Sequence, residues 1–227
     1  MIITWSNSEV VSDAAWEAAY VKFETPQQEM TKFRNRLDFL GVNTWPRDAR
    51  IVELFCGRGN GLRVLESLGF TAVEGVDLSR TLLERYHGIA TLYQGDCRHL
   101  HFEDFSKDVV VVHGGLHHLS VLPDDLVSVL REVCRILRPN GRFVFVEPWL
   151  TPFLRLVHFA CSIRFLRAIW PRLDALNGMI AGEYRQYEQW LNHPDFILRL
   201  IESCFDVELS VISRGKINYI GRKKQES

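Results

Sequence analysis

Hydrophobic positions along the chain follow two alternating periods. Short apolar runs predict strands near residues 51–55, 72–76, 90–94, 108–113 and 142–147. Between these runs, apolar positions at helical spacing predict helices near residues 60–68, 79–87 and 122–137. The uninterrupted valines from Val109 to Val112 are typical of a strand buried on both faces, as in a parallel sheet. The middle of the chain therefore predicts an α/β fold.

Both flanks of this alternating region predict further elements. Helical spacing covers residues 8–40, and Pro26 is placed to open the second helix there. After the fifth strand, three helical stretches and two closing strands are expected at 152–170, 173–190, 194–204, 205–213 and 216–221. Arg214-Gly215 would join the closing strands in a tight hairpin. We expect a single domain in four parts. Residues 1–47 would form an N-terminal helical lid and residues 48–148 the core. Residues 149–195 would form a helical insertion that covers the substrate, and residues 196–227 the closing helix and strands.

The most informative segment is the glycine-rich stretch that follows the first apolar run. Gly57, Gly59 and Gly61 stand between this strand and the next helix, where α/β sheets bind nucleotide-like ligands. Glycine allows the backbone to turn sharply and to approach a ligand closely. The next apolar run ends in Asp77, twenty residues after Gly57, and a carboxylate there can accept both hydroxyls of a ribose. The sequence therefore predicts a cofactor that contains a nucleoside.

The loop also indicates which cofactor it does not bind. The dinucleotide fingerprint requires a third glycine where Leu62 stands, and the chain has no phosphate-binding ATP loop. A glycine-rich loop without a phosphate cradle suits a nucleoside that carries no phosphate. S-adenosylmethionine is the common cofactor of this kind.

The motifs together resemble the class I S-adenosylmethionine-dependent methyltransferases, of the small-molecule, type 11-like group. Residues 53–59, 75–79, 94–97, 108–119 and 130–146 match five of that family's motifs in order. The resemblance implies a Rossmann-like, doubly wound, mostly parallel sheet of seven strands. It also places Asp77 on the ribose and Asp96 on the adenine amino group. The cofactor-binding residues expected on this basis are Glu53, Phe55, Gly57, Gly59, Asp77, Leu78, Asp96, Cys97 and His113.

Two positions depart from the family pattern. The family usually has aspartate where Glu53 stands and glycine where Phe55 stands, although cytosine-5 DNA methyltransferases carry a similar Leu-Phe-Cys-Gly. Their catalytic Pro-Cys motif is absent, as is the Asp/Asn-Pro-Pro-Tyr/Phe signature of the enzymes that methylate amino groups of nucleic acids. We therefore expect no nucleic-acid substrate.

Three histidines follow the fourth strand, where the family has its active-site loop. His113 and His117 are four residues apart, but this spacing brings ligands together only on a helix, so we expect no metal site. We expect His117, or else His118, to act as a general base, because the histidine pKa lies near the working pH. In the alternative, the pair only positions the following helix.

Residues for acceptor binding are expected from the edge of the sheet and from the helical parts. Glu147 ends the fifth strand at the carboxyl edge, where substrates bind in open α/β folds. Tyr20, Tyr184 and Tyr187 could line a pocket, although helical aromatic residues are more often part of a core. Glu147 could equally cap the next helix.

Composition narrows the function further. The net charge of −1 provides no basic field for polyanions, and the five cysteines show no disulfide or zinc pattern. The first residues lack the features of a signal peptide, and no apolar stretch is long enough to span a bilayer, so we expect a cytoplasmic protein. Residues 154–170, apolar with interspersed arginines, also allow an interfacial helix, but we expect core packing or a lid and no membrane contact.

The sequence thus predicts methyl transfer from S-adenosylmethionine to a small-molecule acceptor, with a hydroxyl oxygen favoured by the histidine base. Two alternatives remain: a lipid-like or membrane-associated acceptor, and a protein that binds the cofactor without catalysis. The sequence leaves the acceptor and the oligomeric state open.

Overall fold

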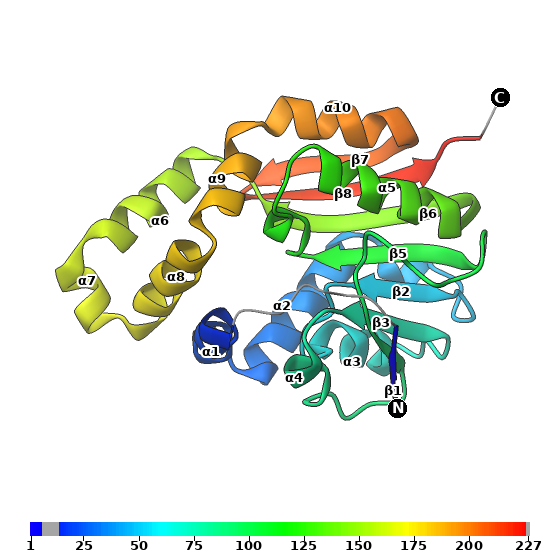
Figure 1. The fold of residues 1–227 in the computed structure, drawn as a ribbon, viewed down its shortest axis with the longest axis horizontal. Coiled ribbons are helices and arrows are strands. Elements are labelled where there is room, and N and C mark those ends of the chain that lie inside the picture. Colours follow the sequence, from blue (N-terminus) through cyan, green and yellow to red (C-terminus); the bar gives the residue numbers. More distant parts are fainter. Residues whose placement is uncertain (6–13, 226–227) are drawn as a thin grey trace.

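The computed structural model describes residues 1–5 and 14–225 (Figure 1). The strands are β1 (Ile2–Thr4), β2 (Ile51–Leu54), β3 (Val73–Asp77), β4 (Thr91–Gln94), β5 (Lys107–His113), β6 (Leu137–Pro148), β7 (Phe205–Ser213) and β8 (Lys216–Lys223). The α-helices are α1 (Ala14–Phe23), α2 (Pro26–Phe39), α3 (Asn60–Ser67), α4 (Arg80–Leu83), α5 (Asp124–Ile136), α6 (Pro152–Ser162), α7 (Arg164–Ile169), α8 (Pro171–Gly182), α9 (Tyr184–Asn192) and α10 (Pro194–Cys204). Two single-turn 3₁₀ helices, η1 (Val42–Thr44) and η2 (Leu116–His118), complete the described chain.

The strands form one sheet in the order β1-β4-β3-β2-β5-β6-β8-β7. The pairs from β1 through β6 are parallel, and β8 is antiparallel to both β6 and β7. The strand order reverses beside β2, which has β3 on one side and β5 on the other. In open α/β sheets such a switch point marks the ligand crevice.

The predicted fold class is confirmed, with one correction to the strand count. Seven strands were expected, and β1 is an eighth that pairs in parallel with β4 at the edge of the sheet. Its three residues are too few to show a period in the sequence. Hydrogen bonds to β4 hold these residues in place, and a hydrophobic pattern cannot predict such bonds. The residue after β1 extends the pairing, because the Trp5 amide donates to the Gln94 carbonyl.

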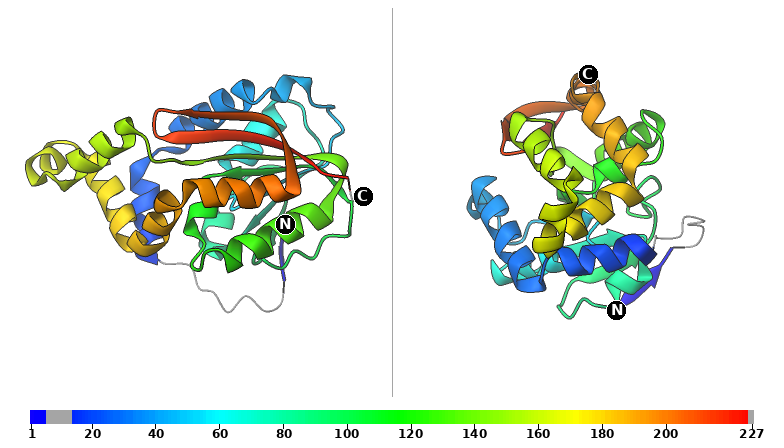
Figure 2. Two further views of the ribbon diagram at one scale, coloured as in Figure 1. Left: turned by 90° about the horizontal axis from the view of Figure 1, so that it is seen from above. Right: turned by 90° about the vertical axis from the view of Figure 1, so that its left-hand side faces the viewer.

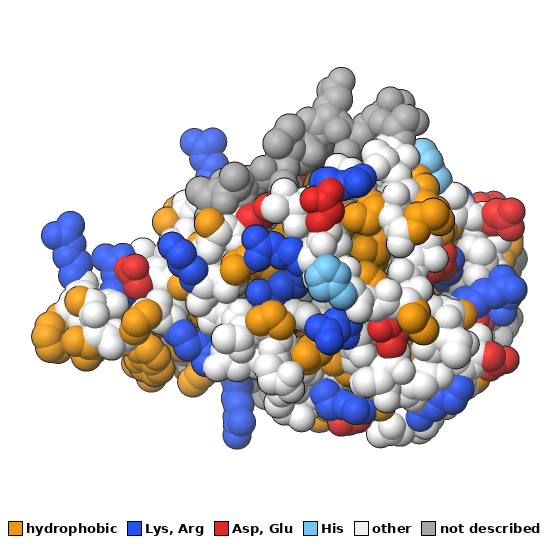
Figure 3. Space-filling model, turned by 90° about the horizontal axis from the view of Figure 1, so that it is seen from below, with side chains coloured by type: hydrophobic (Ala, Val, Ile, Leu, Met, Phe, Trp, Pro, Cys, Tyr) orange, Lys and Arg blue, Asp and Glu red, His pale blue; other side chains and the backbone are white. Residues whose placement is uncertain are grey.

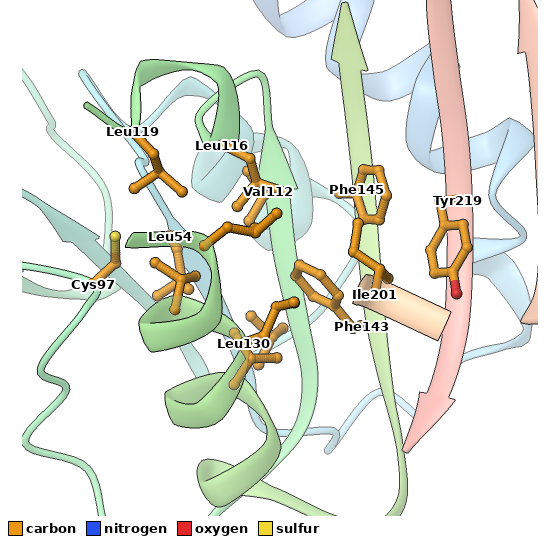
Figure 4. Packing of buried hydrophobic residues seen from close by; sticks show 14 of the residues in the cluster. Leu54, Cys97, Val112, Leu116, Leu119, Leu130, Phe143, Phe145, Ile201 and Tyr219 are labelled. Carbon is orange, nitrogen blue, oxygen red and sulfur yellow. The ribbon is translucent and has the colours of Figure 1, made fainter. Parts of the chain in front are cut away.

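Two buried clusters lie on opposite faces of the sheet. Along β5, Val110 and Val112 join one cluster, and Val109 and Val111 join the other. This two-residue period is the geometry of a strand buried on both sides. Figure 4 shows the first cluster, in which side chains of α5 and α10 pack against β2, β5, β6 and β8. Helices α2 and α3 cover the other face.

The helical insertion leaves the body of the protein after β6. Helices α6 and α7 extend away from the sheet, and α8 and α9 return to it (Figure 2). The long helix expected to end at Trp170 is instead two helices separated at Ile163, and the next helix, α8, begins at Pro171 rather than at Leu173. The expected helix at 79–87 is also shorter, since α4 ends at Leu83.

The predicted N-terminal helix start at Pro26 is confirmed. Thr25 and Gln28 form a capping box at the beginning of α2, and Pro26 occupies its first turn. Residues 8–13 of the expected helical stretch lie outside the described residues. Arg214 and Gly215 join β7 and β8 with positive φ at both residues, which confirms the predicted hairpin.

Candidate active site

The glycine-rich loop connects β2 to α3 at the switch point of the sheet. Gly57 has a φ of +53° and Gly59, the N-cap of α3, has a φ of +71°. These backbone angles favour glycine, because a side chain there costs free energy. A Cβ atom at Gly61 would collide with the carboxyl oxygens of Glu53. The loop therefore needs its glycines for its shape.

Phe55, one of the two departures from the family pattern, also lies in the left-handed region with a φ of +56°. This angle gives a physical reason for glycine at the equivalent position of the family. The ring of Phe55 lies against Gly115, where a Cβ atom would collide with it. The glycine-rich loop and the loop that carries the histidines are thus in contact.

Asp77 lies at the carboxyl end of β3 and closes the glycine-rich loop. Its Oδ2 accepts from the Gly57 amide at 2.7 Å and its Oδ1 accepts from the Ser79 amide at 2.8 Å. Burial raises the pKa of this carboxyl, and the two backbone bonds and the nearby His118 oppose that shift. A carboxylate has about four acceptor positions, so two remain for the hydroxyls of a ribose. Leu78 follows directly and is partly buried.

Asp96 has a different environment from the one expected. Its carboxylate accepts three hydrogen bonds from the guanidinium of Arg98, one at Oδ1 and two at Oδ2, and Arg98 also bonds to Asp125 at 2.8 Å. The backbone amide of Arg98 donates to Asp96 as well. The four bonds from Arg98 to Asp96 use the acceptor positions that an adenine amino group would need, so the adenine role of Asp96 stays a prediction. The neighbouring Cys97 is buried.

A buried polar network joins the N-terminal helices to the glycine-rich loop. Glu29 of α2 accepts hydrogen bonds from Tyr20, Arg58 and Asn60 at 2.5, 2.8 and 2.7 Å. On the other side of the loop, Ser79 donates to Glu17 of α1. Sequence reasoning assigned Tyr20 to the acceptor, but the structure places its hydroxyl beside Gly57, on the cofactor loop.

His117 and Glu147 form a hydrogen-bonded or ion-paired dyad at the carboxyl edge of the sheet. His117 lies in η2 and Glu147 next to the end of β6, with 2.7 Å between Nδ1 and Oε2. The carboxyl group is fully buried, and its Oε1 accepts from the amides of Gly115 and Leu116. Burial lowers the pKa of His117, and the charge of His118 acts in the same direction. The neutral ring with its proton on Nδ1, shared with Glu147, leaves Nε2 able to accept a proton.

His118 forms a second pair of the same kind, with an acid that the sequence did not single out. Its Nδ1 lies 2.5 Å from Oε2 of Glu183, which stands between α8 and α9. The rings of the two adjacent histidines are 4.0 Å apart. Glu183 thus ties the helical insertion to the histidine loop. The sequence predicted only that Glu183 lies in a helical stretch, and this does not indicate a contact with His118.

The other predicted residues divide between the site and its surroundings. Tyr187 packs edge-on against His117, with ring centres 5.7 Å apart, and its hydroxyl bonds to His158. Tyr184 is half exposed and its hydroxyl bonds to Glu188, so the structure gives no support for a role in acceptor binding. His113 stacks on Phe33 of α2 at 4.6 Å. Its side chain therefore faces α2, and its cofactor role stays a prediction.

Within residues 1–5 and 14–225, no group of three or more histidine, cysteine or acidic side chains could hold a metal ion. None of the helices described there is long and apolar enough to cross a bilayer.

Comparison with known proteins identifies the class to which this fold and site belong. The family model for a methyltransferase domain matches residues 52–145. A demethylmenaquinone methyltransferase of Staphylococcus aureus (strain JH9) is 30% identical over 201 residues, which cover 79% of this chain and 78% of that protein. The enzyme of the same name in strain MRSA252 is 31% identical over 158 residues, 65% of this chain and 60% of its own length.

Solved structures agree on the fold. A protein from Pyrococcus horikoshii OT3 has a TM-score of 0.69 at 20% identity, covering 94% of this chain and 100% of its own. An S-adenosylmethionine-dependent methyltransferase from Mesorhizobium loti has a TM-score of 0.55 at 19% identity, covering 83% of this chain and 98% of its own. The chain belongs to the S-adenosylmethionine-dependent methyltransferases.

The residues present fit this methyl donor. Its ribose would meet Asp77, whose acceptor positions are only half used. Its amino-acid part carries an ammonium group, and the buried Oε2 of Glu53 has no hydrogen-bond partner among the described residues. Burial raises the pKa of Glu53 well above its usual range, so a cationic group beside it would be favourable.

Proposed function

We propose that this enzyme methylates a hydroxylated aromatic acceptor of the quinol class. The observation that carries the proposal is the His117–Glu147 pair, a neutral histidine oriented by a buried acid, next to the cofactor loop. The relatives named demethylmenaquinone methyltransferases support a quinone-like ring. An aromatic ring also suits the neighbourhood of Tyr187, which packs edge-on against His117.

The reaction needs a base, because a hydroxyl group is a poor nucleophile. S-adenosylmethionine, when bound, supplies a methyl group on a sulfonium, which is already an activated leaving group. Nε2 of His117 takes the proton of the acceptor hydroxyl, and the charge that develops on the ring of His117 is stabilised by Glu147. The oxygen forms its bond to the methyl carbon as the bond between carbon and sulfur breaks. S-adenosylhomocysteine leaves as the neutral thioether.

The surrounding elements position the acceptor and exclude water. Helix α1 packs against α8, and α9 packs against the histidine turn η2. Helix α1 also bonds to the ribose-side loop through Glu17 and Ser79. The N-terminal helices and the insertion thus meet over the carboxyl edge of the sheet, where the reaction would take place.

The proposal is tested by methyl transfer from labelled S-adenosylmethionine to a reduced, short-chain naphthoquinone. The expected result is a methylated product with the wild-type enzyme, little product with an aromatic amine of similar size, and little product with the His117→Ala variant. Binding of S-adenosylhomocysteine without turnover on any hydroxylated aromatic ring would favour the non-catalytic alternative.

A second candidate concerns the atom that receives the methyl group. A phenolate shares its charge between the oxygen and adjacent ring carbons, so the same base could serve transfer to carbon. The relatives named demethylmenaquinone methyltransferases support a quinone-like ring as the acceptor in this variant too. Nuclear magnetic resonance of the product separates an O-methyl from a ring methyl group.

A further inference from the structure

The helical pair α6–α7 exposes an unusual amount of apolar surface. Six large apolar side chains in this pair and the residue after it are each between 52 and 70% exposed, namely Phe153, Leu156, Phe159, Phe165, Ile169 and Trp170. Figure 3 shows apolar side chains at the end of the projection, with lysine or arginine side chains beside them. We call these six residues the apolar tip. This stretch was expected to pack in the core or to form a lid; core packing is wrong, because Cys161 is the only buried residue of α6 and α7, and the lid stays a prediction.

Helix α6 is apolar on two opposite sides, of which the fold uses one. On the inner side, His158 bonds to Tyr187, and the thiol of Cys161 points to the Leu173 carbonyl. At 3.6 residues per turn, Phe153, Leu156 and Phe159 form a stripe on the other side of the helix. A helix that only covers a core presents polar residues on its outer side. The outer stripe therefore indicates a second contact.

The charges within the segment that carries the tip, residues 148–173, have one sign. Residues 148–173 contain four arginines and neither aspartate nor glutamate, whereas the whole chain has a net charge of −1. Arg172 pairs with Glu24 at 3.1 Å and Arg167 lies 3.6 Å from Asp174. Arg155 and Arg164 are exposed and form no ion pair with any described residue. The tip thus combines exposed apolar side chains with unneutralised positive charge.

We propose that the apolar tip binds the surface of a membrane that contains anionic lipids. The apolar side chains would enter the boundary between headgroups and acyl chains, while Arg155 and Arg164 pair with lipid phosphates. Trp170 has the amphipathic ring that is favoured at this boundary. A second copy of the chain fits the tip less well, because two such surfaces would bring arginines of the same sign together.

This surface goes beyond the proposed function, since it does not depend on the acceptor. It does have a consequence for the active site. The same insertion places Glu183 at His118 and Tyr187 at His117, and His158 of α6 bonds to Tyr187. A tip held at the membrane would bring the active site close to the bilayer. If the quinol acceptor of the proposed function carries a lipid tail, it could then be taken up directly from the membrane.

The test is flotation of the purified protein with vesicles of phosphatidylcholine, with or without phosphatidylglycerol. The wild type should float with the anionic vesicles at low salt. The Phe159→Ser/Phe165→Ser variant should lose most of this binding, and Arg155→Ala/Arg164→Ala should weaken it by about fivefold or more and reduce its salt dependence. Ile89→Ser, at a residue 77% exposed outside the insertion, is the matched control and should bind like the wild type.

All variants should bind S-adenosylhomocysteine normally and turn over a short-chain acceptor, so a loss of flotation cannot be attributed to misfolding. Wild-type protein that stays unbound with anionic vesicles would overturn the proposal. So would a dimer, seen by light scattering, that Phe159→Ser/Phe165→Ser separates, because the tip would then be an interface between copies. The flotation is done without acceptor, so a failure of the proposed quinol chemistry would leave its result unchanged.

Discussion

Nδ1 of His117 lies 2.7 Å from Oε2 of Glu147, although the two residues are 30 positions apart in the chain. The other oxygen of Glu147 accepts from the amides of Gly115 and Leu116. One buried carboxylate therefore shapes the histidine turn and fixes the orientation of the ring. A substitution at Glu147 that keeps one acceptor oxygen can therefore move the proton of His117 from one ring nitrogen to the other without changing the fold.

Replacing Glu147 by glutamine should abolish the base while keeping the structure. The amide oxygen can still accept from Gly115 and Leu116, which turns the amide NH₂ toward His117. Nδ1 must then accept rather than donate, so the proton of the neutral ring moves to Nε2, which can no longer take a proton from the acceptor. Turnover should fall on the order of 10²-fold or more. Affinity for S-adenosylhomocysteine, measured by calorimetry, should stay the same.

Glu183→Gln is the matched control, since Glu183 contacts His118 in the same way. It should leave turnover within a few-fold of the wild type. A larger loss in Glu183→Gln than in Glu147→Gln would move the base to His118.

His117→Ala should remove one limb of the pH–rate profile as well as most of the turnover. A histidine with its ordinary pKa would place this limb at about 6.5. In the structure, burial and the charge of His118 lower the pKa of His117. The neutral, active form therefore persists to lower pH, and the rise of activity with pH should occur below about 6.5. A limb above that value in the wild type would contradict the environment described for His117.

Much of the core could be predicted from the sequence, because each part of it follows from local pattern. The valine-rich β5, the glycine-rich loop and Asp77 at the end of β3 are all visible as periodicity and spacing. The partners of the site residues were not visible. Glu183 reaches His118 from 65 positions away, and Glu29 reaches Asn60 from 31. Such contacts depend on how helices pack, and nothing in the local sequence encodes that distance.

Asp77→Ala should affect both cofactor binding and folding. An acid at a strand end that contacts only the cofactor would contribute little to folding. The structure shows that Asp77 also accepts from the amides of Gly57 and Ser79, so its loss leaves two partly buried amides without this partner. Affinity for S-adenosylhomocysteine should fall by roughly 1.5–3 kcal/mol, and the melting temperature without cofactor should fall as well. An unchanged dissociation constant would place the ribose elsewhere.

The positive φ of Phe55 predicts an inverted order of stability between glycine and alanine. Where φ is negative, alanine stabilises the folded state over glycine by roughly 0.5–1 kcal/mol in helices and strands. At a φ of +56° the Cβ atom itself costs about 1–2 kcal/mol, which glycine avoids. Phe55→Gly should therefore be more stable than Phe55→Ala in urea denaturation. At Leu156, in the middle of α6, the same pair of substitutions should give the usual order.

Lys216 should make stability depend on pH in the alkaline range. It lies at the start of β8, where burial and the charges of Arg36 and Lys32 lower its pKa to about 7, opposed by Glu24 and Glu147. In the unfolded chain its pKa is about 10.4. Below pH 7 the lysine is protonated in both states, so the folded state is destabilised by the full free energy of burying the charged amine. Between these two values the unfolded chain binds more protons, so the stability of the folded state rises with pH.

Replacing this lysine by methionine removes the charge at every pH. Lys216→Met should therefore raise the melting temperature most below pH 7, and the gain should shrink as the pH rises toward and past about 10.4, above which wild-type Lys216 is neutral in both states. Lys22→Met, at an exposed lysine of α1, is the matched control and should show no such dependence. The measurement is the difference in melting temperature between variant and wild type across the pH range. A difference that stays constant with pH would mean that Lys216 keeps its proton in the folded protein well above neutral pH.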